Sequence, residues 1–268
     1  MARKKEAKKS VKKKTIKKIK SVEKSFTKKP SMLEKIPTGV SIFDTLCGGG
    51  LNKESVNLIV GGAGSGKTIF SVQFLVEGLK RGETCMYITF EEKKEELFTN
   101  MSEFGFDLEK YEKSGKFIFI EYSPEKVKSM LEEGGGTLES LVYKSKINRL
   151  VIDSITSFTL LFESELSKRE AALSLFDIIK RWKCSVLLTM EKELSKAELL
   201  YGSESAMEFE VDSVILMFLL RINDGKRERL VEILKMRGTK HSKYAYPFDI
   251  NENGIVISKS PLKKVNTN

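Results

Sequence analysis

Cysteine and long apolar runs are both scarce in this sequence of 268 residues, and each scarcity excludes a class of protein. The only cysteines are Cys47, Cys85 and Cys184, an odd and scattered set that suggests no disulfide framework and fits a reducing cytoplasm. The longest apolar run, 214–220, is far too short to span a bilayer. The basic start is not followed by an apolar segment, so we expect neither a signal peptide nor membrane insertion.

Acidic and aromatic residues are almost missing from the first 30 residues. This stretch carries 14 Lys or Arg against Glu6 and Glu23, a net charge of +12, so residues 31–268 sum to −2. With few large apolar residues, it predicts a disordered arm. Such an arm binds phosphates electrostatically, which leaves nucleic acid, anionic lipid and an acidic protein open as partners. Its one aromatic residue, Phe26, gives no support for stacking on bases.

The rest of the chain alternates apolar strands with helical patterns. Strands that are apolar nearly throughout predict an α/β fold, in which helices cover both faces of a mostly parallel sheet. We expect one nucleotide-binding domain over 31–260 and a short tail over 261–268. The last two apolar strands, 246–250 and 254–258, predict a hairpin that turns at Asn253-Gly254. The expected strands are 55–60, 85–90, 117–120, 149–153, 185–190, 211–220, 229–234, 246–250 and 254–258. Helical patterns follow the glycine-rich loop at 61–68 and cover 93–104, 107–113, 124–131, 138–144 and 167–182.

The most specific motif is Gly61-Gly-Ala-Gly-Ser-Gly-Lys-Thr68, which matches G-x-x-x-x-G-K-[ST] between a predicted strand and a predicted helix. Its glycines allow backbone N–H groups to converge on phosphate oxygens, and the helix N-terminus adds its dipole. Lys67 would reach the β- and γ-phosphates, and the Thr68 hydroxyl would bind Mg²⁺. The predicted nucleotide-binding residues of this segment are Gly61, Gly62, Ala63, Gly64, Ser65, Gly66, Lys67, Thr68 and Ile69.

Acidic residues follow several of the predicted strands. Asp153 ends the run 149–153 in the Walker B arrangement, so its carboxylate predicts the second protein group for Mg²⁺. Glu91 and Glu92 follow the second strand, where either one could orient the attacking water as a general base. Because the carboxyl ends of parallel strands meet at one edge of a sheet, we expect these residues and Glu191 beside the loop.

Lys235 and Arg237 lie two residues apart at the end of a predicted strand, so both side chains point to one face. A pair of cations there could neutralise charge that develops on a γ-phosphate. From the spacing alone, however, the default interpretation is two solvated surface charges.

Taken together, these motifs resemble the KaiC-like branch of the RecA superfamily, over about 36–258. The matching segments are Thr38-Gly39, Gly48-Gly-Gly-Leu51, Gly61–Thr68, Thr89-Phe-Glu-Glu92, Phe104-Gly-Phe-Asp107, Val151-Ile-Asp153, Lys235-Met-Arg-Gly-Thr239 with His241, and Tyr246-Pro-Phe248.

This resemblance implies a RecA-like ATPase core that assembles into a ring, commonly a hexamer, with ATP and Mg²⁺ between subunits. It implies that Glu91 and Glu92 supply the catalytic carboxylates. It also implies that Lys235 and Arg237 reach ATP bound by the neighbouring subunit. The further contacts that it implies are Met236, Thr239 and His241.

The chain departs from that family in three respects. Circadian KaiC has two such domains in tandem, and this chain has one. The phosphoacceptor Ser-Thr pair is replaced by Glu208-Phe209, which argues against clock-type autophosphorylation, although Ser203 and Ser205 lie close by. Glu103 stands where the family has a small hydroxyl residue that contacts adenosine.

Three functions remain open from the sequence. The first is a slow regulatory ATPase that forms a ring. The second is a recombinase-like protein that binds nucleic acid, for which Gly134–Gly136 is the candidate loop. The third is an assembly module in which ATP joins subunits with little turnover.

Overall fold

A computed structural model describes residues 33–123, 125–126, 129, 136–201, 206–221 and 225–263. Its contacts divide the chain into the units 1–34 and 35–268, and the helices and strands of the described residues belong to the second unit. Several predicted features lie outside the described residues. They are the basic arm, most of the helix at 124–131, Gly134, Gly135, Ser203, Ser205, the turn residues Asn223 and Asp224, and 264–268.

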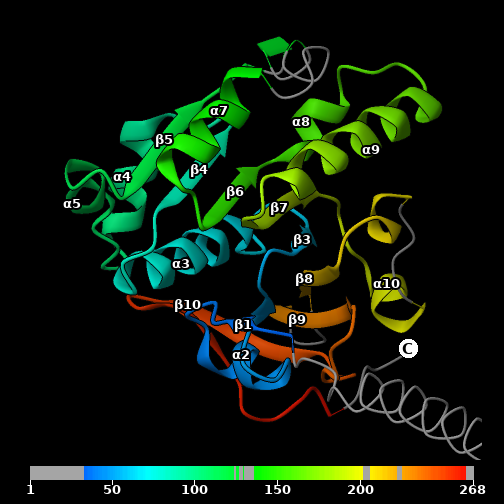
Figure 1. Ribbon diagram of the computed structural model, residues 1–268. Helices are drawn as coiled ribbons and strands as arrows, with labels where there is room; N and C mark the ends of the chain where they lie inside the picture. The colour runs from blue at the N-terminus through cyan, green and yellow to red at the C-terminus, as the bar shows by residue number, and fades with distance from the viewer. Residues whose placement is uncertain are drawn as a thin grey trace, which may run out of the picture. The chain divides into compact units, whose positions relative to one another are not determined.

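A nine-stranded sheet organises this unit, in the order β11-β10-β9-β8-β3-β7-β6-β4-β5 (Figure 1). The neighbours from β8 to β5 pair in parallel, whereas β9, β10 and β11 continue the sheet by antiparallel pairing. This confirms the predicted fold class and the terminal hairpin. The strands are β3 (Val56–Gly61), β4 (Cys85–Thr89), β5 (Phe117–Glu121), β6 (Arg149–Asp153), β7 (Ser185–Glu191), β8 (Ser213–Arg221), β9 (Arg227–Met236), β10 (Tyr246–Asn251) and β11 (Gly254–Ile257).

Helices cover both faces of the sheet, as Figure 1 shows. One face carries α2 (Ser41–Leu46), α3 (Lys67–Lys80), α4 (Lys94–Ser102) and α5 (Leu108–Lys113). The other carries α7 (Gly136–Ser145), α8 (Ile155–Thr159) and α9 (Glu165–Arg181). Successive strand residues alternate between the two apolar layers: Leu58 and Val60 pack with α9, whereas Ile59 packs with α3. Burial on both sides explains why these strands are apolar nearly throughout.

Several short elements have no counterpart in the sequence analysis. They are the pair β1 (Lys35–Ile36) and β2 (Leu51–Asn52), α8, α10 (Lys196–Tyr201) and the 3₁₀ turn η1 (Ala206–Phe209). Each is too short to show a hydrophobic period, so pattern reading does not detect it.

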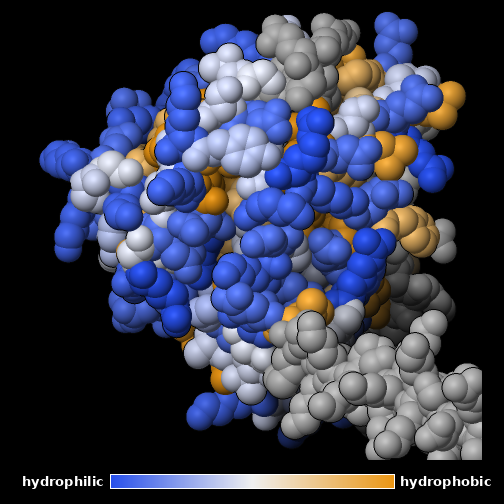
Figure 2. Space-filling view, viewed as in Figure 1, coloured by the Kyte–Doolittle hydropathy of each residue, from blue (hydrophilic) through white to orange (hydrophobic). Residues whose placement is uncertain are grey.

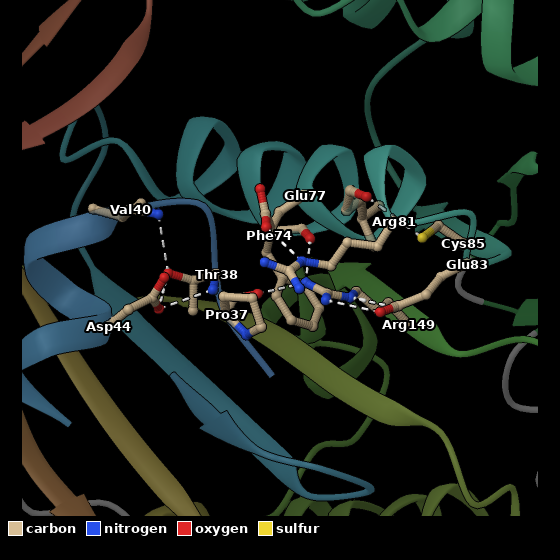
Figure 3. A network of polar contacts seen from close by, with 11 residues as sticks. Pro37, Thr38, Val40, Asp44, Phe74, Glu77, Arg81, Glu83, Cys85 and Arg149 are labelled. Carbon is tan, nitrogen blue, oxygen red and sulfur yellow. Dashed lines mark hydrogen bonds and ion pairs between the residues drawn. The ribbon is translucent and has the colours of Figure 1, made fainter. Parts of the chain in front are cut away.

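A buried arginine ties β6 to the start of the domain (Figure 3). Arg149 is fully buried; its Nε donates to Glu83 Oε2 at 2.6 Å, and another guanidinium nitrogen donates to the carbonyls of Pro37 and Phe74 at 2.7 and 2.8 Å. The guanidinium also lies 4.7 Å from the centre of the Phe74 ring. Gly78 lies against this group, because a Cβ there would stand 2.6 Å from Arg149 Nε.

The three cysteines are free and buried, and burial raises the pKa of each thiol to about 12. Within the part of the chain that the structure describes, no helix combines the length and apolar character needed to cross a bilayer.

Candidate active site

The glycine-rich loop joins the end of β3 to the start of α3, as its motif predicts. Gly66 precedes the helix with a φ of 102°, a left-handed conformation that favours glycine. A Cβ on Gly61 would stand 2.4 Å from the carbonyl oxygen of Met217, so only glycine fits there. Lys67 is buried, and its Nζ donates to the carbonyl of Gly62 at 3.0 Å. Burial lowers the pKa of Lys67, while the nearby carboxylates, Glu191 first, oppose this shift.

Asp153 lies at the end of β6 with both carboxylate oxygens engaged. Thr68 Oγ1 and the Tyr87 hydroxyl donate to Oδ2 at 2.9 and 2.8 Å, and Thr189 Oγ1 donates to Oδ1 at 2.5 Å. The structure therefore brings together Thr68 and Asp153, the predicted metal ligands. Tyr87 and Thr189 fix the orientation of the carboxylate from the two neighbouring strands.

The donors at this point fit Mg²⁺. One hydroxyl and one carboxylate are hard oxygen ligands, and Mg²⁺ is usually bound through one or two such groups together with phosphate oxygens and water. Among the described residues, no group of three or more His, Cys, Asp or Glu is placed to hold a metal by itself. The arrangement thus suits a metal that arrives with a phosphate-bearing ligand.

Glu91 and Glu92 follow β4 on the same edge as Asp153. The Thr89 hydroxyl accepts both of their backbone N–H groups, at 3.2 and 3.1 Å. Glu91 accepts a hydrogen bond from Ser157 in α8. Burial, and next the charge of Asp153, raise the pKa of Glu92 above its ordinary value. A carboxylate of raised pKa beside a phosphate-binding loop has the character of a general base.

Glu191 completes this edge, because β7 pairs with β3 so that Glu191 lies opposite Gly61. Its Oε1 is 3.9 Å from Lys67 Nζ. Glu193, which the sequence analysis missed, places its carboxylate 2.6 Å from the position that a Cβ on Gly62 would take. The edge therefore carries several carboxylates around Lys67.

Lys235 and Arg237 lie at the opposite edge of the sheet. Strand β9 runs antiparallel to β8, so it ends where β8 begins: Lys235 pairs with Val214, and the Arg237 N–H donates to the Asp212 carbonyl. Both side chains bind one turn of the chain, since Lys235 Nζ donates to the Glu208 carbonyl at 2.8 Å and a guanidinium nitrogen of Arg237 donates to the Phe209 carbonyl at 2.5 Å.

The remaining predicted contacts lie beside these cations. The Thr239 hydroxyl accepts from Lys35 Nζ at 2.8 Å and donates to Asn52 Oδ1 at 3.1 Å. Met236 ends β9, with its sulfur 3.6 Å from the same Lys35 Nζ. His241 Nδ1 is 2.8 Å from the Ser242 carbonyl oxygen. The structure thus gathers the predicted residues into two groups, one at each edge of the sheet.

Besides Glu193, three supporting residues were not predicted. Tyr87 and Thr189 contact Asp153, and Arg229 in β9 donates from Nε to the Gly64 carbonyl in the loop at 3.2 Å. A polar residue inside an apolar strand is the only signal for Thr189 and Tyr87 in the sequence. Arg229 carries no signal, because its contact depends on where β9 lies in the sheet.

Comparison with known proteins gives a consistent result. A family model described as the ATPase KaiC matches residues 36–261. The circadian clock protein KaiC3 of Synechocystis is 37% identical over 234 residues, which cover 84% of this chain and 46% of that protein. A UPF0273 protein of Thermotoga maritima is 34% identical over 243 residues, which cover 85% of this chain and 98% of that protein.

The fold is also similar to a solved structure. A KaiC-like protein from the archaeon Pyrococcus horikoshii OT3 superposes with a TM-score of 0.73 and 35% identity, over 84% of this chain and 99% of that one. The chain therefore spans about half the length of KaiC3 and nearly all of the UPF0273 and archaeal KaiC-like proteins.

Proposed function

The chain belongs to the KaiC-like family of ATPases in the RecA superfamily, and from this premise we propose that it is a slow regulatory ATPase that works as a ring. Each site takes Mg²⁺ and ATP on the loop of one subunit and is completed by Lys235 and Arg237 of the next. The resemblance to KaiC points to six subunits.

One observation carries the shared site: the two groups of residues lie at opposite ends of the strands. Gly61 is level with Met217 in β8, whereas the backbone of Arg237 is level with Asp212. These positions are separated by about 17 Å along the strand, at ~3.4 Å per residue. An Arg side chain cannot span that distance, so Arg237 cannot reach a phosphate on its own loop. We therefore infer that a second subunit supplies these two cations.

Within one subunit, each group of residues has a separate role. The loop N–H groups and Lys67 bind the phosphates, and Thr68 with Asp153 would hold Mg²⁺, which neutralises charge on the β- and γ-phosphates. Tyr87 and Thr189 keep the Asp153 carboxylate in place. Glu91 or Glu92 accepts a proton from the attacking water. The raised pKa of Glu92 favours that residue as the proton acceptor.

The partner's Lys235 and Arg237 stabilise charge that develops during transfer, as an arginine finger does. In the free subunit these cations bind the carbonyls of Glu208 and Phe209. Slow turnover follows if both cations have to leave these contacts before each reaction. Met236, Thr239 and His241 lie beside them and complete the part of the interface that faces nucleotide.

The test measures ATP turnover and light scattering on the same samples of full-length protein, with and without Mg²⁺ and single-stranded DNA. We expect assembly that requires nucleotide, slow turnover that requires Mg²⁺, and no turnover in Lys67→Ala or Arg237→Ala. Unchanged turnover in Arg237→Ala contradicts the shared site. Turnover stimulated by DNA favours the nucleic-acid function, and assembly without turnover favours the assembly module.

A further inference from the structure

Three apolar side chains stand out on the surface of the described residues. Leu160 is 74% exposed, Phe209 71% and Leu166 66%, the highest values among the large exposed hydrophobic residues. Figure 2 shows orange side chains breaking the hydrophilic surface on the side where α8 and α9 lie. Single exposed apolar residues are common on protein surfaces, so the significance of these three rests on their places beside the two groups of site residues.

Leu160 and Leu166 border the carboxylate edge of the candidate site. Leu160 directly follows α8, three residues after Ser157, so both lie on one face of that turn. Ser157 binds Glu91, and Thr156 in the same helix accepts the backbone N–H of Glu191. Leu166 lies in the first turn of α9, just beyond the α8–α9 connection. We call Leu160 and Leu166 the leucine patch.

Phe209 lies beside the two cations at the other edge. Its carbonyl accepts from Lys235 Nζ at 3.3 Å and from Arg237 at 2.5 Å. The backbone of Phe209 is therefore held by both cations while its ring faces solvent. Whatever covers this ring also comes close to Lys235 and Arg237.

We propose that Phe209 of one subunit packs on the leucine patch of the next subunit. This inference rests on the proposed function, because it names the contact that brings the cations of one subunit to the phosphate site of its neighbour. The apolar contact supplies affinity near the reacting groups, and the cations follow because they are hydrogen-bonded to the same residue.

Charge supports a second copy of this chain as the partner. The edge beside the leucine patch carries Glu91, Glu92, Asp153 and Glu191, and bound triphosphate adds further negative charge. The surface beside Phe209 offers Lys235 and Arg237, the latter with half of its side chain exposed and 3.7 Å from Asp212. The charges of Glu208 and Glu210 also act on Lys235, so these two cations, and not a wholly basic surface, are what the neighbour's phosphates meet. Cations presented to a concentration of carboxylates and phosphates give the complementary potential that fixes register in an interface.

The geometry also predicts the symmetry of the assembly. In the proposed ring, the leucine patch of one subunit pairs with Phe209 of the next, so the subunits are joined head to tail. Such a heterologous contact leaves one free patch of each kind until the chain of subunits closes. A reciprocal two-fold contact would instead use both patches of each subunit and stop at two subunits, so the assembly size from light scattering separates the two arrangements.

Cysteine cross-linking on full-length protein tests this pairing, because the native cysteines are all buried. Leu160→Cys and Phe209→Cys are made as separate proteins, mixed with ATP and Mg²⁺, and treated with a mild oxidant. We expect disulfide-linked dimers in the mixture and no disulfide-linked species in either variant alone. Tyr143→Cys, at a side chain 51% exposed in α7, is the matched control and forms no dimer with Phe209→Cys.

Light scattering and turnover on the same samples separate this pairing from the shared site. Rings and activity without Leu160–Phe209 dimers overturn the pairing and leave the shared site standing. Strong dimers of Leu160→Cys alone show a two-fold contact and overturn it as well. If the wild-type protein shows neither assembly nor turnover, the proposed function itself is contradicted. In addition, Phe209→Ala raises the concentration for half-assembly by about tenfold, as expected for a buried aromatic anchor, and Tyr143→Ala does not.

Discussion

Tyr87→Phe removes one hydroxyl from the support of Asp153 and leaves the aromatic ring in place. The ring is fully buried and stacks on Phe119 with centroids 5.9 Å apart, so the packing survives. Burial and the charge of Asp153 raise the pKa of Tyr87 well above its ordinary value, so the hydroxyl is protonated at any physiological pH. It therefore always donates to Asp153 Oδ2, at 2.8 Å.

The size of the effect follows from what remains around the carboxylate. Loss of an outer partner of a metal ligand costs about 10- to 100-fold in metal affinity. Thr189 still holds Oδ1 in the variant, so we expect the lower end, about tenfold or ~1.4 kcal/mol. The Mg²⁺ concentration for half-maximal nucleotide binding and for half-maximal turnover rises together, while the rate at saturating Mg²⁺ changes by less than about twofold.

The assay is a Mg²⁺ titration followed by a fluorescent ATP analogue and by phosphate release. Tyr143→Phe is the matched control, since it also removes a hydroxyl that donates to an oxygen, the carbonyl of Arg181 at 2.9 Å. Arg181 ends α9 just before β7 begins, so this bond lies at the edge of the sheet opposite Asp153. An unchanged Mg²⁺ midpoint in Tyr87→Phe, equal to that of the control, refutes the positioning role.

Two further predictions concern acid–base chemistry and stability. Turnover falls at acid pH as Glu92 gains a proton, and this happens above the ordinary pKa of a glutamate because burial and the charge of Asp153 raise the pKa of Glu92. Glu92→Gln removes most of the rate and also removes the acid limb of the pH–rate profile. An acid limb that persists in Glu92→Gln assigns the base to Glu91. Arg149→Ala lowers the free energy of unfolding in denaturant titrations by about 3–5 kcal/mol, because Glu83 and two buried carbonyls lose their donor. A loss below ~1 kcal/mol shows that water replaces the guanidinium.

Most of the residues around the glycine-rich loop can be predicted from local sequence. The loop at 61–68 has a unique glycine spacing, and Asp153 follows an apolar strand, so each is recognisable within a few residues. The rule that strand ends share one edge then places Glu91 and Glu92 near them, and the structure has this arrangement. These features depend on short-range order and on one general property of parallel sheets.

The place of the two cations and of the supporting residues could not be predicted in the same way. Lys235 and Arg237 reach the opposite edge because β9 is antiparallel to β8, and strand direction is not encoded in the spacing of the two cations. The support of Asp153 by Tyr87 and Thr189 depends on register between strands 36 or more residues apart in the chain. Arg149 reads as an ordinary charge before a strand, yet it is fully buried because Glu83 and two carbonyls compensate it.

Mixing two inactive variants tests the shared site most directly. Glu91→Gln/Glu92→Gln keeps the loop and both cations but lacks the base, whereas Arg237→Ala keeps the base but lacks the finger. In a ring of subunits mixed at random and at equal concentration, a site is active when its loop and base come from an Arg237→Ala subunit and its arginine comes from a Glu91→Gln/Glu92→Gln neighbour. This combination occurs at about one site in four, so the mixture recovers about 25% of the wild-type rate per site. A mixture that is no more active than the mean of the two variants contradicts a site shared between subunits.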